Sequence, residues 1–252
     1  MSQFYVNQED LRYPAFRLAG EESTHLRKVL RARPGDRIKI FDGLGNSWNG
    51  MIREFGRDYA EGEIIEDLPK RTVPAKITLC FAMPARAAFE AIIERCTAAG
   101  VCIFQPIITE RTQQGGIASD AREWERRLAR LRQIMISSCR QCERADLPEI
   151  RTPMRYRDIV PVSKGIIASF GGISVAESVG RFAVQCGKVM EFSIFVGPEG
   201  GFTQSELEIS EKAGIVSVSL GNYVLRAEDA CFYAVLAAIN HSPHPQPLTH
   251  KG

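Results

Sequence analysis

The sequence predicts an α/β protein in which a small β-rich unit precedes a larger domain built on a mostly parallel sheet. Three observations support this fold class. The first 70 residues contain short alternating segments between turn signals, a pattern typical of a small barrel. Residues 66–74 carry Pro69 and Pro74 among mixed charges and form the expected boundary. Beyond it, apolar runs alternate with helical patterns, which favours βα units around a parallel sheet.

The N-terminal unit, residues 1–70, is predicted to hold one short helix and three strands. Glu21 and Glu22 precede a helix over residues 25–30, because acidic side chains are stabilised near the positive end of a helix. A turn is expected at residues 33–36. The alternation of apolar and polar residues predicts strands at 37–41, 47–53 and 59–65.

The larger domain is predicted over residues 75–241, with residues 242–252 as a disordered tail. The continuous apolar run at 76–81 is typical of a strand buried on both faces. Further strands are expected at 101–108, 165–170, 192–196 and 216–220, and helices at 86–99, 121–144 and 231–239. Capping residues mark three helix starts: Ser119-Asp120, Ser174 with Glu177, and Thr203 with Glu206.

Positive charge is concentrated in two segments. The net charge is only +2, but residues 111–157 hold eleven arginines against six carboxylates, and residues 16–39 hold seven basic residues against three acids. From residue 158 onward the balance is reversed, with nine acids against six basic residues. This distribution favours a phosphate-binding surface. The alternative is that the charged helix faces are only solvated.

Composition argues against several protein classes. The chain is 44% hydrophobic and 25% charged, which is ordinary for a globular protein. Seven cysteines, an odd number, and no signal-peptide pattern indicate reduced thiols in a cytoplasmic protein. No apolar run is long enough to cross a bilayer, so no membrane partner is expected. Cys139 and Cys142 have no second cysteine pair at zinc spacing, so no metal is expected.

Two glycine-bearing loops follow predicted strands and form the candidate ligand site. Gly197-Pro198-Glu199-Gly200-Gly201 follows the strand at 192–196, and Gly221-Asn222-Tyr223-Val224-Leu225-Arg226 follows the strand at 216–220. Ligands of open parallel sheets bind beyond the carboxyl ends of the strands, and glycine lets backbone groups approach a flat ligand. Neither loop has the lysine of a P-loop or the glycine spacing of a dinucleotide site. Taken alone, either loop is explained equally well as a βα turn.

Taken together, the two loops resemble the RsmE family, SPOUT-class enzymes that methylate N3 of a uridine in 16S ribosomal RNA of the small subunit. The resemblance is carried by Phe195-Val196-Gly197-Pro198-Glu199-Gly200-Gly201-Phe202-Thr203 with Glu206, and by Leu220-Gly221 with Val224-Leu225-Arg226-Ala227-Glu228. The segment His25-Leu26-Arg27-Lys28-Val29-Leu30-Arg31 resembles the family's N-terminal PUA-like RNA-binding barrel, and Glu110-Arg111 resembles the middle of its catalytic domain.

The resemblance implies a C-terminal SPOUT-type trefoil-knotted α/β domain, a homodimer, and S-adenosyl-L-methionine (SAM) as the cofactor. The implied partner is 16S ribosomal RNA or the small ribosomal subunit. The residues implied to line the cofactor pocket are Val196, Gly197, Gly200, Gly201, Leu220, Gly221, Val224, Leu225, Arg226 and Ala230, with Ser169, Phe170 and Gly171 as a third wall.

Candidate catalytic residues follow from the reaction. Loss of the uridine N3 proton builds negative charge on the ring oxygens, and Arg226 on the cofactor loop is the candidate for stabilising it. Glu228 or Glu199 is expected to orient the base or accept the proton, although a carboxylate is a weak base for this. Each acid also has an alternative, structural role: Glu228 could cap the helix that follows it, and Glu199 could hold its own loop.

Candidate RNA-binding residues lie in both basic segments. His25, Arg27, Lys28 and Arg31 are expected to contact RNA from the N-terminal unit. Arg122, Arg126 and Arg130 recur every four residues, which places them on one face of the long helix, ready to meet phosphates.

The chain departs from the family pattern at three places, which keeps other functions open. Ala98-Ala99 stands where the family has an acid and a leucine, Arg140 where it has an acid, and Asp229 where it has a threonine. The alternatives are a ribosome-assembly factor that binds RNA but is weakly active or inactive as a methyltransferase, and a methyltransferase with another RNA target.

Overall fold

The computed structural model describes residues 3–71, 73, 75–112, 121–183 and 190–242. The chain forms two compact units, the first of Met1–Arg71 with Ile136–Leu147 and the second of Thr72–Met135 with Pro148–Gly252. The structure therefore adds a segment of the long helix and its following loop to the N-terminal unit. The domain bounds predicted from the sequence stay a prediction.

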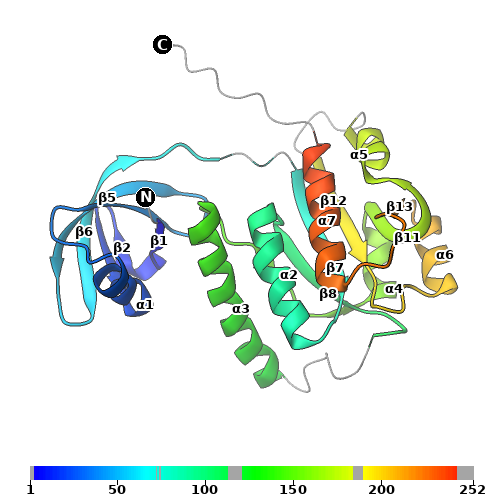
Figure 1. Cartoon of the computed structure of the whole chain (residues 1–252), viewed down its shortest axis with the longest axis horizontal. Helices are drawn as coiled ribbons and strands as arrows, with labels where there is room; N and C mark the ends of the chain where they lie inside the picture. Colours follow the sequence, from blue (N-terminus) through cyan, green and yellow to red (C-terminus); the bar gives the residue numbers. More distant parts are fainter. Residues whose placement is uncertain (1–2, 72, 74, 113–120, 184–189, 243–252) are drawn as a thin grey trace, which may run out of the picture. The chain divides into compact units, whose positions relative to one another are not determined.

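The N-terminal unit is built on a curled six-stranded sheet (Figure 1). Its strands are β1 (Gln3–Tyr5), β2 (Leu11–Arg12), β3 (Ala15–Ala19), β4 (Arg37–Phe41), β5 (Ser47–Phe55) and β6 (Tyr59–Asp67), in the order β1-β4-β5-β6-β3-β2. All neighbours are antiparallel except β1 and β4. The three predicted strands are confirmed as β4, β5 and β6, the last two each two residues longer. The strands β1, β2 and β3 were not predicted. β1 and β2 have only three and two residues, which carry too little pattern, whereas the alternation of β3 was missed.

The core of this sheet depends on two glycines. Phe16 of β3 is buried, and its ring lies across β5 and β6. A Cβ on Gly50 would come within 2.6 Å of the ring, and one on Gly62 within 2.3 Å. Glycine at both positions therefore makes room for the ring. Buried Phe4, Leu18 and, from β4, Ile38 and Ile40 belong to the same cluster.

The helix of the N-terminal unit begins earlier than predicted. The structure has α1 at Gly20–Thr24, which continues into a π-helical turn at His25–Val29. Gly20 has a φ of +59°, so it can turn the chain directly out of β3. Glu21 and Glu22 then lie in the first turn rather than before it, still at the positive end of the helix.

The second unit contains the predicted parallel sheet. Its strands are β7 (Ala75–Ala82), β8 (Ile103–Ile108), β9 (Glu149–Ile150), β10 (Met154–Arg155), β11 (Gly165–Ser174), β12 (Met190–Val196) and β13 (Val216–Ser219). The order is β10-β8-β7-β12-β11-β13, with β9 beside β8, and every pairing is parallel. The ends of β12, β11 and β13 are therefore adjacent at one edge. The predicted trefoil knot stays a prediction.

Helices pack on both faces of this sheet. They are α2 (Arg86–Ala99), α4 (Tyr156–Ile159), α5 (Val175–Ala183), α6 (Gln204–Lys212) and α7 (Ala227–Asn240), and the long α3 spans Ala121–Cys142. The helices α2 and α7 lie side by side on one face, with α4 and α6 on the other (Figure 1). Within the described residues, no helix is long and apolar enough to cross a bilayer.

Two further helix ends differ from the prediction by two residues or more. The structure begins α7 at Ala227, four residues before the predicted start, because the apolar pattern used for prediction starts only at Cys231. It ends α3 at Cys142, two residues early, where Glu143 takes a φ of +58°. The predicted cap Ser119-Asp120 lies outside the described residues.

The capping box at α6 is confirmed in both directions. The Thr203 hydroxyl accepts the Glu206 backbone N–H, and the Glu206 carboxylate accepts the Thr203 N–H at 2.9 Å. At α5 only half forms: Ser174 Oγ accepts the Glu177 N–H at 3.1 Å, while the Glu177 carboxylate pairs with Arg181.

Candidate active site

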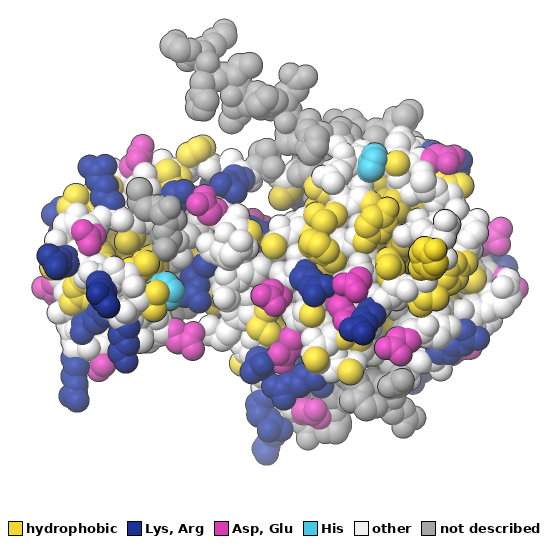
Figure 2. All heavy atoms as spheres, viewed as in Figure 1, with side chains coloured by type: hydrophobic (Ala, Val, Ile, Leu, Met, Phe, Trp, Pro, Cys, Tyr) yellow, Lys and Arg dark blue, Asp and Glu magenta, His cyan; other side chains and the backbone are white. Residues whose placement is uncertain are grey.

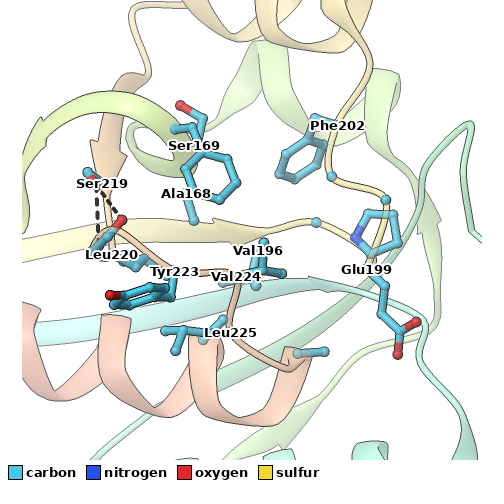
Figure 3. A pocket seen from close by; sticks show the side chains of 18 of the residues that line it. Ala168, Ser169, Val196, Glu199, Phe202, Ser219, Leu220, Tyr223, Val224 and Leu225 are labelled. Carbon is cyan, nitrogen blue, oxygen red and sulfur yellow. Dashed lines mark hydrogen bonds between the residues drawn. The ribbon is translucent and has the colours of Figure 1, made fainter.

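A cavity of about 380 Å³ lies at the carboxyl ends of β11, β12 and β13 (Figure 3). Parallel sheets place their ligand sites at this edge. The lining residues are Ala168, Ser169, Phe170, Val196, Gly197, Pro198, Glu199, Gly200, Gly201, Phe202, Leu207, Ser219, Leu220, Gly221, Tyr223, Val224, Leu225, Ala227 and Ala230. Both predicted glycine loops therefore face one cavity.

The first loop is shaped by the buried strand that precedes it. Val196 ends β12, whose last five residues are all buried. A Cβ on Gly197 would come within 3.0 Å of the Phe202 ring, so glycine allows that ring to fold over the loop. Gly201 has a φ of +68°, which sends the chain into the capped start of α6.

The second loop presents its backbone. Residues 221–226 are exposed, and Gly221 has a φ of +127° that a residue with a Cβ rarely adopts. Its N–H donates to Ser219 Oγ at 3.3 Å (Figure 3). Within the described chain, the backbone N–H groups of residues 222–225 have no hydrogen-bond partner. This loop therefore has donors and acceptors available to a ligand.

The third wall comes from β11. Ala168 and Ser169 are partly buried in it, and the Phe170 ring is 71% exposed. The strand is irregular here, since its pairing with β13 shifts register between Ala168 and Ile173. That irregularity places Gly171 at a φ of +80°, outside the lining.

A hydrogen-bond network fixes the first loop to the turn after β8. The buried Glu206 carboxylate accepts the Glu110 backbone N–H at 2.9 Å, and Ser205 Oγ donates to the Glu110 carboxylate at 3.3 Å. The Arg111 guanidinium donates to the backbone carbonyl of Gly200. Sequence reasoning missed this network, because only the fold brings residues 110 and 206 together.

Most of the predicted cofactor residues meet at this cavity. Eleven of the thirteen line it: Ser169, Phe170, Val196, Gly197, Gly200, Gly201, Leu220, Gly221, Val224, Leu225 and Ala230. Gly171 and Arg226 do not. Sequence reasoning missed Ala168, Pro198, Phe202, Leu207, Ser219, Tyr223 and Ala227 as lining residues. Several of these neighbour predicted residues, so the strand-end rule could have included them.

Of the three predicted catalytic residues, Glu199 lines the cavity, and Arg226 and Glu228 are chain neighbours of lining residues. Arg226 is the exposed N-cap residue of α7, and its guanidinium has no hydrogen bond or ion pair within the described chain. Glu228 lies in the first turn of α7, half-buried. Glu199 belongs to the lining, but its carboxylate points away from the apolar side chains (Figure 3).

The predicted RNA-binding residues of the N-terminal unit fall into two groups. His25 packs edge-to-face on Phe4, with ring centroids 5.8 Å apart. Arg27 donates to the Tyr59 carbonyl at 3.1 Å and lies over the Phe55 ring. Lys28 and Arg31, in contrast, are exposed. Lys28 and Arg31 are therefore more available to a phosphate than His25 and Arg27.

The three predicted arginines of α3 also differ. Arg130 donates two hydrogen bonds to Glu90 of α2, at 2.5 and 2.8 Å, and Glu90 also accepts from Arg86. These bonds, that from Arg130 above all, lower the pKa of Glu90 to about 2. Arg126 bonds the Arg122 backbone carbonyl at 3.4 Å. Arg122 and Arg126 are exposed.

Two departures from the family pattern have structural partners. Arg140 bonds Glu22 at 3.2 Å within the N-terminal unit, and both side chains are largely covered. Burial raises the pKa of Glu22 to about 7, although Arg140 acts in the opposite direction. Asp229 pairs with Arg95 at 2.8 Å, joining α7 to α2. Nothing in the structure explains Ala98.

Three buried thiols are poor nucleophiles. Burial raises the pKa of Cys80, Cys96 and Cys139 to about 12, so they stay protonated. Within the described residues, no group of three His, Cys, Asp or Glu side chains could hold a metal ion.

Comparisons with known proteins agree on one family. Residues 71–239 match the family described as the RNA methyltransferase domain, and residues 18–65 match the RNA methyltransferase PUA domain. Ribosomal RNA small subunit methyltransferase E of Synechocystis is 30% identical over 86% of this chain and 69% of its own. The protein of that name from Aquifex aeolicus is 32% identical over 71% and 74%.

A solved structure extends this similarity to the fold. Ribosomal RNA small subunit methyltransferase E from Neisseria gonorrhoeae, bound to S-adenosyl methionine, superposes with a TM-score of 0.79. It is 27% identical and covers 94% of this chain and 96% of its own. The likeness therefore includes both units.

Proposed function

This chain belongs to the ribosomal RNA small subunit methyltransferase E family, and we propose on that basis that it methylates N3 of a uridine in 16S ribosomal RNA, with SAM as methyl donor. The observation that carries the proposal is the single cavity shared by two glycine loops on adjacent strand ends. A relative of known structure binds SAM. The fold positions both loops at the edge where parallel sheets bind ligands.

The cavity suits SAM in size and chemistry. Its volume of about 380 Å³ falls within the usual range for ligand pockets, on the order of 300–1,000 Å³. Val196, Phe202 and Leu225 supply apolar surface for a flat adenine (Figure 3). The unpaired backbone groups of residues 222–225 can bond the edge of such a ring, in place of water. When bound, SAM supplies a methyl group already activated by its sulfonium.

The chain's own contribution is then alignment and control of charge. Arg226 adjoins Leu225 of the lining, and its guanidinium has no partner in the described chain. We assign it to the negative charge that develops on the uridine oxygens as the N3 proton leaves. An arginine held by an ion pair would be less available for this task.

The proton acceptor is one of two carboxylates in this proposal. Glu228 lies one residue beyond Ala227 of the lining, in the same helical turn as Arg226. Glu199 lines the cavity, with its carboxylate turned outward (Figure 3). The outward direction favours Glu228 for contact with the base and Glu199 for a role in its loop.

We propose RNA contacts at those predicted RNA-binding residues whose basic side chains are exposed. Lys28 and Arg31 of the N-terminal unit and Arg122 and Arg126 of α3 are exposed and suited to phosphates. His25, Arg27 and Arg130 stay in the proposal as neighbours that shape these surfaces, since each already contacts other side chains or backbone. With 16S ribosomal RNA or the small ribosomal subunit as the proposed substrate, we propose the cytoplasm as the location of the protein.

We further propose a homodimer that covers an apolar surface of the second unit. Large exposed apolar side chains there are Phe170, Tyr223, Val224 and Tyr233, each at least half exposed. Hydrophobic side chains are visible over the region of α7 and the loop before it (Figure 2). Patches of this kind on a folded chain typically mark interaction sites. Sedimentation of the purified protein tests this, and a monomer at micromolar concentration would contradict it.

The reaction is tested on ribosomal RNA from a strain that lacks the gene. Mass spectrometry of 16S fragments is expected to show loss of one N3-methyluridine, restored by the wild-type gene. Unchanged methylation would refute the proposed substrate. Titration of the purified protein with SAM tests the cofactor independently of the RNA substrate. No binding heat and no thermal shift would refute the methyltransferase activity.

A further inference from the structure

The turn that follows β8 touches the candidate cofactor loop without lining the cavity. Arg111 lies in this turn, and its guanidinium donates to the backbone carbonyl of Gly200. Gly200 itself is part of the lining, whereas Arg111 is not. The arginine stem also packs on this glycine, since a Cβ on Gly200 would lie 3.4 Å from Arg111 Cδ.

The same turn makes two further hydrogen bonds, to residues in the first turn of α6. The backbone N–H of Glu110 donates to the Glu206 carboxylate at 2.9 Å, and Ser205 donates to the Glu110 side chain at 3.3 Å. Glu206 is only 3% exposed and also holds the Thr203 N–H. The turn is therefore fixed to the start of α6, and Arg111 extends from this fixed turn to Gly200 of the loop.

We propose that Arg111 is a positioning residue that holds the 197–201 loop in its SAM-binding conformation. The loop has intrinsic freedom, because Gly197, Gly200 and Gly201 carry no Cβ and its one internal backbone bond joins Gly201 to Pro198. Without the bond to Gly200, such a loop samples more conformations, and the fraction of molecules competent to bind SAM falls. The apparent affinity for SAM falls by the same factor.

This inference rests on the proposed function, since it presumes that the cavity binds SAM. It predicts an effect on cofactor affinity rather than on the chemical step, because Arg111 touches the loop and not the cavity. A charged hydrogen bond to a backbone carbonyl stabilises a conformation strongly enough for roughly a fivefold to tenfold change in population. Arg111 is exposed, so its replacement leaves the core intact.

The test compares SAM affinity in Arg111→Gln with wild type by calorimetry. Gln keeps part of the aliphatic stem over Gly200 but is too short to make the bond. The dissociation constant is expected to rise about fivefold to tenfold, with kcat at saturating SAM within about twofold of wild type. Arg111→Lys, which retains a donor, is expected to fall between the two. Arg157→Gln, at an exposed arginine of α4, is the matched control and is expected to bind like wild type.

The outcomes separate this inference from the proposed function. Failure of the wild-type protein to bind SAM would refute the proposed function itself. Wild-type binding with equal affinity in Arg111→Gln would overturn only the positioning role. A loss of kcat with unchanged SAM affinity would also overturn it, since Arg111 would then act on RNA or on the chemical step.

Discussion

The buried carboxylate of Glu206 accepts the backbone N–H of Glu110 at 2.9 Å, although the two residues are 96 positions apart in the chain. The same carboxylate closes the capping box with Thr203. One side chain thus fixes a helix start, a glycine loop and the turn after β8. This connection makes the stability of α6 and the shape of the cavity depend on each other.

Replacing Glu206 by alanine is expected to lower the free energy of unfolding by about 2–3 kcal/mol, because two backbone N–H groups lose their acceptor. Urea denaturation of the purified protein measures this change. Glu208→Ala, at an exposed position of the same helix, is the control and is expected to cost about 0.5 kcal/mol or less. Equal losses in the two variants would contradict the bridging role.

Arg226→Ala is expected to lower kcat for RNA methylation by about 100-fold or more. The variant lacks the guanidinium that stabilises the negative charge developing on the uridine oxygens. SAM affinity is expected to stay within about threefold, since Arg226 lies outside the lining. Methyl transfer from labelled SAM to small subunits from the deletion strain measures the first quantity, and calorimetry the second. Full activity in the variant would remove Arg226 from the mechanism.

Gly221→Ala tests the conformation of the second loop. A Cβ at this position meets no atom within 4 Å, but the φ of +127° is one that alanine rarely adopts, and the strain is about 1–3 kcal/mol. SAM affinity is therefore expected to fall about tenfold or more. Gly180→Ala, in α5 with open space around it, is expected to bind SAM normally and to gain about 0.5–1 kcal/mol of stability. The same affinity in both variants would show that the loop conformation is not needed.

The stability of the N-terminal unit is expected to depend on pH through Glu22. Its pKa in the folded protein is about 7, above the ordinary value of 4.5, because burial disfavours the charged form. The folded state therefore holds the proton more tightly. The resulting stabilisation is fully present below pH 4.5 and is lost as the pH rises through about 7.

Urea denaturation at pH 5 and pH 8 measures this dependence. Wild type is expected to lose about 2 kcal/mol between these values through Glu22. Because Glu22→Gln cannot ionise at this position, its loss of unfolding free energy between pH 5 and pH 8 is expected to be smaller than that of wild type by the same amount. Glu54→Gln, at an exposed position of β5, is the control and should follow wild type. If Glu22→Gln kept the wild-type pH profile, the pH dependence of stability would come from other groups.

Local pattern was sufficient for much of the second unit. The buried apolar runs of β7 and β12 and the Thr203–Glu206 box each depend on residues a few positions apart, and each was predicted correctly. Pattern was insufficient at element ends. The start of α7 at Ala227 lies in the polar segment before the apolar stripe, and α1 begins at a glycine whose φ of +59° has no signature in composition. Such ends are set by turn geometry and packing.

The sequence by itself determined which loops could bind a ligand, because Gly197, Gly201 and Gly221 are local requirements of backbone conformation, and because the two motifs together match one family. Only the tertiary structure decided what those loops meet. It brought Phe202 over Gly197, tied Arg111 to Gly200, and left Arg226 unpaired while Arg130 was bound by Glu90. The Arg111–Gly200 and Arg130–Glu90 hydrogen bonds join residues far apart in the chain. They depend on strand order and helix packing, which no local pattern specifies.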